Sequence, residues 1–248
     1  MQKKVFIENK YGEKLAGLVD YPEEKKDKYP AVILVHGFGM TKDEGGVFID
    51  FAKFLRERGF VVVRFDFSGR GDSEGNHVET SLYKQIDELK LFVNFMKNHK
   101  DVRKSDLTIV AQSFGTVSTI CLSPKVSRII LVGTVENPLE TLSELFGDGY
   151  NPSGISCRAK ADNSLTKVGP LFWKNLNDYD LSKKIRGIKA PILFIHGKKD
   201  SKVPISGMRK LFSIAQKAKK REMAGMDHGW YPYEKEIFNI IEDYIRKT

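Results

Sequence analysis

Cysteine and long apolar runs are both scarce in this sequence. The 248 residues include two cysteines, Cys121 and Cys157, which form neither a C-x-x-C pair nor a spacing typical of a metal site. Free thiols in a reducing compartment are therefore expected, with no metal. Residues 1–10 carry charges but no apolar stretch of signal-peptide length follows them, and no later run is long enough to cross a bilayer. These absences predict a cytoplasmic protein without a membrane span.

Basic residues are in excess, but they are scattered along the chain. There are 41 lysines and arginines against 32 acidic residues, which gives a formal net charge of +9. A nucleic-acid-binding protein gathers its basic residues on one face or tract. The denser stretches here, residues 25–28, 183–186 and 217–221, fall where loops and helix ends are expected. We therefore expect no nucleic-acid partner, while attraction to anionic substrates such as coenzyme A esters stays open.

Apolar runs of strand length alternate with amphipathic helical patterns along most of the chain. Such runs are typical of parallel strands that are covered on both faces. Strands are predicted at residues 5–7, 14–20, 31–35, 60–66, 107–112, 128–133, 191–196 and 219–223. Helices are predicted at residues 47–58, 81–99, 116–121, 205–218 and 231–246. The first two strands form an antiparallel pair, and the rest predicts an α/β fold, a mostly parallel central sheet with helices on both faces.

The alternation breaks after residue 133 and resumes at residue 188. Residues 134–187 contain no clean strand and are rich in aromatic residues, glycine, proline and asparagine. Because so long a structureless loop is unusual in a compact domain, we expect a small inserted lid of short helices or a hairpin. The core would then comprise residues 1–133 and 188–248. Within the lid, Phe146, Phe172 and Trp173 are candidates for a substrate-binding wall, and packing between lid and core is the competing interpretation.

One predicted strand ends abruptly in Ala111-Gln-Ser-Phe-Gly115. A sharp turn between this strand and the following helix would hold Ser113 in a strained conformation with its hydroxyl exposed. The pattern is that of a nucleophile elbow, G-x-S-x-G, with Ala111 in place of the first glycine. Because alanine adds only a methyl group, the turn remains feasible. Ser113 is therefore the candidate nucleophile, although a turn serine without a chemical role fits the five residues alone equally well.

Two further residues supply what a serine nucleophile needs. A serine hydroxyl requires a neighbouring base, and the base requires a carboxylate that fixes its tautomer. His228 and Asp200 fit these roles, and the chain order serine, aspartate, histidine is that of the elbow-bearing class. Asp227 and Glu136 are competing acids. Asp227 is adjacent to His228 and would point away from its ring, and Glu136 ranks well behind Asp200.

The other four of the five histidines have less specific signals. His36 and His196 directly follow apolar strands, so we expect them to hydrogen-bond turn backbone. His77 and His99 lie in a loop and near a helix end, where surface positions are expected, although His77 could rim the pocket.

Taken together, these motifs resemble the α/β-hydrolase superfamily, and in particular its small serine esterases of the cinnamoyl or feruloyl type. The resemblance spans nearly the whole chain and rests on five loose motifs in the family's order. They are residues 36–39 (HGFG), 66–75 (DFSGRGDSEG), 111–115 (AQSFG), 196–204 (HGKKDSKVP) and 227–229 (DHG). It implies an oxyanion hole formed by the backbone N–H groups of Phe38 and Phe114. The lid matches nothing that carries over residue by residue.

The expected activity is that of a cofactor-independent serine carboxylesterase acting on small-molecule esters with short-chain or aromatic acyl groups. The catalytic residues would be Ser113, His228 and Asp200, working through an acyl-enzyme intermediate. An acyl-CoA thioesterase or a serine peptidase would use the same residues. A non-catalytic binding module that retains the fold is a remote alternative. A homodimer is one assembly that this reading allows.

Overall fold

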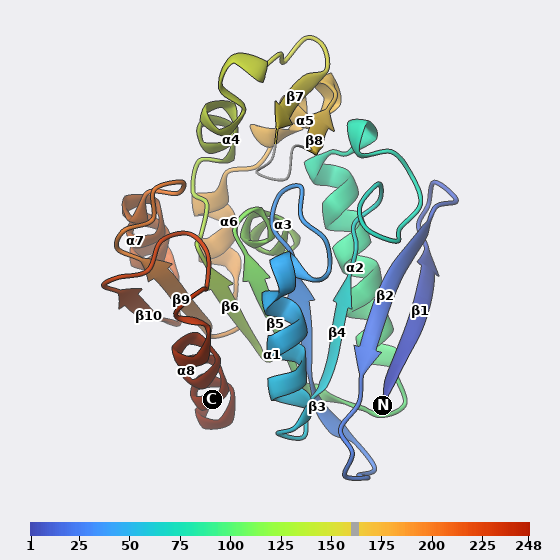
Figure 1. Ribbon diagram of the computed structural model, residues 1–248. Helices are drawn as coiled ribbons and strands as arrows, with labels where there is room; N and C mark the ends of the chain where they lie inside the picture. Colours follow the sequence, from blue (N-terminus) through green and yellow to red (C-terminus); the bar gives the residue numbers. More distant parts are fainter. Residues whose placement is uncertain (160–163) are drawn as a thin grey trace.

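The computed structural model describes residues 1–159 and 164–248 (Figure 1). Its centre is an eight-stranded sheet in the order β1-β2-β4-β3-β5-β6-β9-β10. The strands are β1 (Gln2–Glu8), β2 (Lys14–Asp20), β3 (Tyr29–Val35), β4 (Val61–Phe65), β5 (Val102–Gln112), β6 (Arg128–Val132), β9 (Ile192–Gly197) and β10 (Ala218–Met223). Only the β1/β2 and β2/β4 pairs are antiparallel. The mostly parallel sheet is the predicted one, and no helix in the described residues is long and apolar enough to span a membrane.

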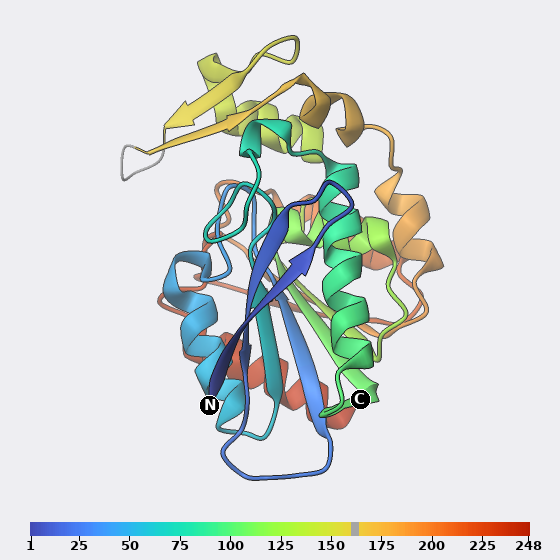
Figure 2. The same cartoon turned by 90° about the vertical axis from the view of Figure 1, so that its right-hand side faces the viewer.

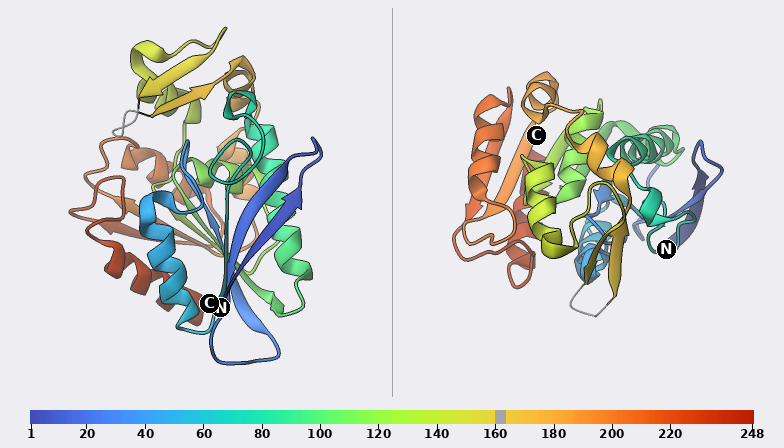
Figure 3. Two further views of the ribbon diagram at one scale, coloured as in Figure 1. Left: turned by 45° about the vertical axis from the view of Figure 1, so that its right-hand side comes forward. Right: turned by 90° about the horizontal axis from the view of Figure 1, so that it is seen from above.

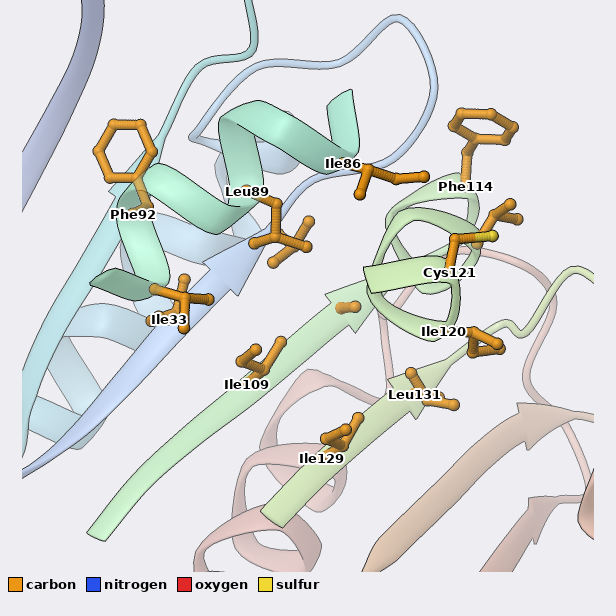
Figure 4. Packing of buried hydrophobic residues seen from close by; sticks show 14 of the residues in the cluster. Ile33, Ile86, Leu89, Phe92, Ile109, Phe114, Ile120, Cys121, Ile129 and Leu131 are labelled. Atoms are coloured by element: carbon orange, nitrogen blue, oxygen red, sulfur yellow. The ribbon is translucent and has the colours of Figure 1, made fainter. Parts of the chain in front are cut away.

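Helices cover both faces of the sheet (Figure 2). On one face lie α1 (Val47–Arg56) and α8 (Glu234–Lys247), and on the other lie α2 (Leu82–Asn98), α3 (Phe114–Leu122), α6 (Leu181–Gly187) and α7 (Ile205–Ile214). Strand residues alternate between the two faces. Val32 and Leu34 therefore pack in the core beneath α1 and α8, whereas Ile33 packs in the other core. Figure 4 shows Ile33, Ile109 and Ile129 from three neighbouring strands beneath α2 and α3.

Most element boundaries agree with the sequence patterns. Strand β1 begins at Gln2 instead of residue 5, β5 begins at Val102 instead of residue 107, and two helix boundaries also differ. The last helix begins at Glu234 instead of residue 231, because residues 230–233 form a turn closed by a 2.6 Å hydrogen bond from Tyr233 N to Trp230 O. Helix α7 ends at Ile214 instead of residue 218, since Ala218 already pairs with Ile192 in the sheet. Short 3₁₀ turns occur at η1 (Glu44–Gly46), η2 (His77–Glu79) and η3 (Gly147–Gly149).

The segment between β6 and β9 contains helices and a hairpin. It comprises α4 (Pro138–Phe146), β7 (Ser156–Ala159), β8 (Leu165–Val168), α5 (Pro170–Leu176) and α6. Short helices and a hairpin are the two kinds of structure expected for this segment. The sequence shows no clean strand pattern there because β7 and β8 have only four residues each and are too short to show a period. Residues 160–163 of the expected lid lie outside the described residues.

Four of these elements, α4, β7, β8 and α5, lie above the sheet, and we call them the cap elements (Figures 1 and 3). Helix α6 lies lower, in the helical layer beside α3 and α7. Its side chains Leu181 and Ile185 belong to the main core. The part of residues 134–187 that stands over the ends of the strands therefore ends before α6.

Candidate functional site

Ser113 occupies the sharp turn between β5 and α3. Its backbone has φ 52° and ψ −122°, a conformation that L-residues rarely adopt. Strained conformations of this kind occur mainly at functional sites. Gly115 makes the turn feasible, because a Cβ atom at this position would lie 2.7 Å from the carbonyl oxygens of Val35 and His36. The turn therefore presses β3 against the start of α3 and places the serine at the carboxyl end of β5.

The three predicted polar residues meet at this turn. His228 Nε2 lies 2.9 Å from Ser113 Oγ, and His228 Nδ1 lies 2.8 Å from Asp200 Oδ2. The Asp200 side chain is buried, and that of His228 is 14% exposed. With Nδ1–H donating to the carboxylate, Nε2 is free to accept the serine proton. Residues separated by 115 and 28 positions in the chain thus form one continuous hydrogen-bonded line.

The carboxylate of Asp200 is held at both oxygens. Oδ1 accepts backbone N–H bonds from Lys202 (3.0 Å) and Val203 (2.8 Å), while Oδ2 faces His228 and, at 3.2 Å, His196 Nε2. Burial alone would raise the pKa of Asp200. Hydrogen bonds from His196 and His228 outweigh this effect and hold its pKa well below the ordinary range. Asp200 is therefore an anion whenever the protein is folded near neutral pH.

His196 is fully buried and contributes to this arrangement. Its Nε2 lies 3.0 Å from the carbonyl oxygen of Val203 and 3.2 Å from Asp200 Oδ2, so this nitrogen carries the hydrogen. The predicted bond to turn backbone is present. The additional contact with the acid was missed, because it depends on how the loop of residues 197–203 folds back on the strand.

A second network fixes the loop that carries His228. Gln112, the residue before the serine, donates from Nε2 to the His228 carbonyl oxygen at 3.1 Å, and its Oε1 accepts from Trp230 Nε1 at 2.7 Å. Both side chains are buried. The side-chain amide of Gln112 therefore hydrogen-bonds the residues on both sides of Gly229. No sequence pattern indicates this role, because the second position of the elbow pattern is unspecified.

Residues 36–39 form a turn that follows β3 directly beside the serine. We call it the oxyanion turn, because it carries Phe38, one of the two expected oxyanion donors. Gly37 lies so near that a Cβ atom there would be 3.2 Å from Ser113 Cβ, and its N–H donates to Glu44 Oε2 at 2.6 Å. Within residues 1–159 and 164–248, no hydrogen bond engages the N–H group of Phe38 or of Phe114. Phe114 begins α3, whose N-terminus contributes positive potential. Two backbone donors are thus open near Ser113.

A cavity of about 300 Å³ opens over Ser113 and His228. Its wall includes residues from the oxyanion turn, from α4 and from the loops that carry the acid and the base. The apolar lining includes Phe38, Met40, Val47, Phe114, Val135, Leu142, Leu145, Val203 and Trp230, and three charged residues, Glu44, Arg158 and Lys202, also line it.

The three aromatic candidates for the substrate wall lie elsewhere. Phe146, Phe172 and Trp173 are buried and do not line the cavity. The ring centroid of Trp173 lies 5.2 Å from that of Phe146 and 5.3 Å from that of Phe172. Phe38 contacts Phe172 at 5.3 Å and Phe146 at 5.7 Å. They pack the cap elements onto the oxyanion turn, which was the competing interpretation. The cap elements contribute Thr141, Leu142 and Leu145 of α4 and Arg158 of β7 to the cavity wall instead.

The competing acids are engaged away from the His228 ring. Asp227 accepts hydrogen bonds from Ser201, and Glu136 pairs with Lys210 Nζ at 2.6 Å. His36 bonds turn backbone as expected, through Gly37 O and Phe67 N.

The surface assignment of two histidines was wrong. His77 is buried beside the Phe38 ring, and His99 is partly buried with Nε2 2.9 Å from the Tyr21 hydroxyl. His77 begins the 3₁₀ turn η2, and His99 follows the last residue of α2. The sequence pattern does not reveal how either side chain packs. No group of three or more histidine, cysteine, aspartate or glutamate residues in the described part of the chain could hold a metal ion.

The chain is similar to several known hydrolases. The family described as serine aminopeptidase, S33, matches residues 26–140. Lysophosphatidylserine lipase ABHD12 from Danio rerio is 24% identical over 91% of this chain, and human palmitoyl-protein thioesterase ABHD10 is 25% identical over 72% of it. The chain spans 60% of the length of each of these two relatives.

A solved structure is similar over nearly its full length. Est1E from Butyrivibrio proteoclasticus, with bound ferulic acid, has a TM-score of 0.86 and 20% identity, and the match covers 98% of both chains. A likeness at this level of identity shows a shared fold. The strand order and the helical layers agree with this likeness, and the chain has the α/β-hydrolase fold.

Proposed function

We propose that this protein is a serine hydrolase that cleaves carboxylic esters through an acyl-enzyme intermediate. Ser113 Oγ attacks the ester carbonyl carbon while His228 Nε2 takes the hydroxyl proton. The ester C–O bond then breaks, and His228 returns the proton to the leaving alkoxide. Water, deprotonated by the same nitrogen, then attacks the acyl-serine. The bond between the acyl carbon and Ser113 Oγ breaks, His228 returns the proton to Oγ, and the acid leaves. Asp200 stabilises the imidazolium and fixes its tautomer.

The observation that carries this proposal is the hydrogen-bonded line from Asp200 through His228 to Ser113, at 2.8 and 2.9 Å. The strained backbone of Ser113 supports it, because a serine without a chemical role has no need of that conformation. The free N–H groups of Phe38 and Phe114 would receive the oxyanion. Donors of this kind typically contribute about 3 kcal/mol each to the transition state.

The size of the cavity supports small acyl groups. A volume of about 300 Å³ lies at the lower end of the usual range for ligand sites. Short-chain or aromatic acyl esters would fit it. The structural neighbour Est1E holds ferulic acid, and the relatives named above include a lipase and a thioesterase, so ester and thioester bonds are both within the chemistry of similar proteins.

The test compares Ser113→Ala with Ser213→Ala on p-nitrophenyl acetate and butyrate. Ser213 lies on α7, where its hydroxyl donates to Lys210 O, away from the site. The proposal predicts that kcat falls by about 10³-fold or more in the first variant and is unchanged in the second. Undiminished turnover by Ser113→Ala would rule the proposal out.

Two other activities would use the same residues. A thioesterase is favoured by the ABHD10 relative, and a peptidase by the description of the matching family. Acyl-CoA substrates of increasing chain length and aminoacyl amides, assayed beside the nitrophenyl esters, separate the three. A kcat/KM that is highest for a thioester or an amide would replace the ester proposal with that activity.

A further inference from the structure

We infer that the preferred substrate carries an anionic group, carboxylate, sulfonate or phosphate, that is bound by Arg158 and Lys202. The inference rests on the proposed ester hydrolysis and adds a substrate class to it. Arg158 lies on strand β7 of the cap hairpin, and Lys202 lies in the loop after Asp200. Both line the cavity that contains Ser113, so two cations from opposite parts of the fold converge on one site.

Within the described residues, no ion pair engages Arg158 or Lys202, whereas other cations beside the oxyanion turn are occupied. Lys42 pairs with buried Asp66 at 2.8 Å, and Arg70 donates to the Met40 carbonyl oxygen at 3.1 Å. Arg158 is also half-buried, which places its charge in surroundings where an ion interacts more strongly than in bulk water.

The position of each residue is fixed by its neighbours. Arg158 pairs across the hairpin with Thr166, and Thr166 packs against Gly39 of the oxyanion turn, where a Cβ atom would lie 3.2 Å from its side chain. The backbone N–H of Lys202 donates to Asp200 Oδ1. The side chains therefore extend from elements that are anchored to the site itself.

Among the described residues that line the cavity, Glu44 is the one carboxylate, and it limits where an anion can lie. Glu44 accepts the N–H of Gly37 and so directs one oxygen at the oxyanion turn. An anionic group would be repelled from that side and attracted to the side of Arg158 and Lys202. Because the apolar lining surrounds Ser113, the predicted ligand has an uncharged reacting ester and a negative charge a few bonds away.

The test uses a matched pair of esters, phenyl acetate and 4-acetoxybenzenesulfonate. The measured quantity is the ratio of their kcat/KM values, and comparing this ratio between variants cancels the intrinsic reactivity of each ester. We expect the anionic preference to fall about 3-fold in Arg158→Gln and in Lys202→Gln, and about 10-fold in the double variant. It should also weaken as sodium chloride is added.

Two control variants each remove one positive charge from a position near Arg158 or Lys202. Lys199→Gln alters an exposed lysine in the loop that carries Lys202, and Lys167→Gln alters one on the partner strand of Arg158. Neither lysine lines the cavity. Both should leave the ratio unchanged. A double variant whose ratio stays within 2-fold of the unaltered protein, or controls that lower the ratio equally, would overturn the inference.

A binding measurement keeps the test independent of turnover. Both esters are titrated into Ser113→Ala by calorimetry, with and without the two glutamine substitutions. The inference predicts tighter binding of the sulfonate ester, lost in the triple variant, and equal affinities would contradict it. Hydrolysis of neither ester by the unaltered protein would count against the proposed function alone, since binding would still report the anion site.

Discussion

At the scale of single residues, the candidate acid is the most constrained group in the site. Asp200 receives two backbone N–H bonds and faces two imidazole rings, His228 and His196. The second ring does not reach the serine, so its effect on chemistry must pass through Asp200. His196 is therefore a positioning residue in the proposed mechanism.

Replacing His196 should impair turnover by loosening Asp200. His196→Leu removes a hydrogen bond to a carboxylate, an interaction worth about 2 kcal/mol, so we expect kcat to fall about 10-fold or more while KM changes little. His196→Gln can donate a hydrogen bond again and should recover part of the activity. Equal losses in both variants would indicate packing alone.

The residues of the site were predictable to different degrees. Ser113, Asp200 and His228 each lie in a local motif, and their chain order links them, so the sequence alone selects them for one site. The roles of Gln112, His196 and Glu44 could not be predicted. They depend on which carbonyl or N–H group a folded loop brings near, and nothing in their sequence neighbours encodes this.

At the scale of elements, the cap and the oxyanion turn are joined through aromatic rings. Phe172 of α5 is fully buried, with its ring centroid 5.3 Å from that of Phe38 and 5.6 Å from that of Phe114. The backbone N–H groups of these two neighbours are the proposed oxyanion donors. A cap helix therefore packs against both halves of the proposed oxyanion hole.

A smaller side chain at Phe172 should misplace those donors. Phe172→Leu should lower kcat on p-nitrophenyl butyrate about 10-fold, because donors shifted by a fraction of an ångström lose part of their transition-state stabilisation. Phe212→Leu, which removes a ring from α7 that packs on Phe194, serves as the control for lost aromatic packing. Thermal unfolding is measured for both. If kcat changes no more in Phe172→Leu than in Phe212→Leu, the cap does not position the oxyanion donors.

Elements long enough to show a regular hydrophobic pattern could be predicted from the sequence, and short elements could not. The apolar runs of β3 to β6 and the amphipathic stripe of α2 can be recognised in the sequence. In the structure the Ser81 hydroxyl accepts the N–H of Lys84 at the start of α2. The hairpin β7–β8 has too few residues for a period. The aromatic residues of the cap could pack inward or face a ligand, and composition alone does not distinguish the two.

At the scale of the whole molecule, one buried histidine makes the stability of the fold depend on pH. Burial lowers the pKa of His36 to about 4 from an ordinary value of 6.5. The unfolded chain therefore binds a proton more readily than the folded chain in this window. The neutral form contributes stability that is fully present above pH 6.5 and is lost as the pH falls toward 4.

We expect this histidine alone to lower the free energy of unfolding by about 2 kcal/mol between pH 7.5 and pH 5. Urea denaturation at the two pH values measures the change, and His36→Gln should remove most of it. The ring carbon resonance of His36 provides an independent check by NMR titration of the unaltered protein. A midpoint near 6.5 would contradict the burial argument.

The sheet also explains how three distant segments form one site. Parallel strands β5 and β9 end at the same edge, so the loops after them bring Ser113 and Asp200 together, and the loop after β10 adds His228. This convergence follows from the strand order, which the sequence motifs predict through their similarity to a known superfamily. The substrate does not follow from it, because the cap elements contribute part of the cavity wall.

The most direct test of the proposed nucleophile is covalent labelling. The protein is treated with a fluorophosphonate, digested and analysed by tandem mass spectrometry, with Ser113→Ala and Ser213→Ala treated in parallel. The account predicts a single phosphonylated residue, Ser113, in the unaltered protein and in Ser213→Ala, and no adduct in Ser113→Ala. An adduct at another residue, or an unmodified Ser113 in the folded protein, would contradict it.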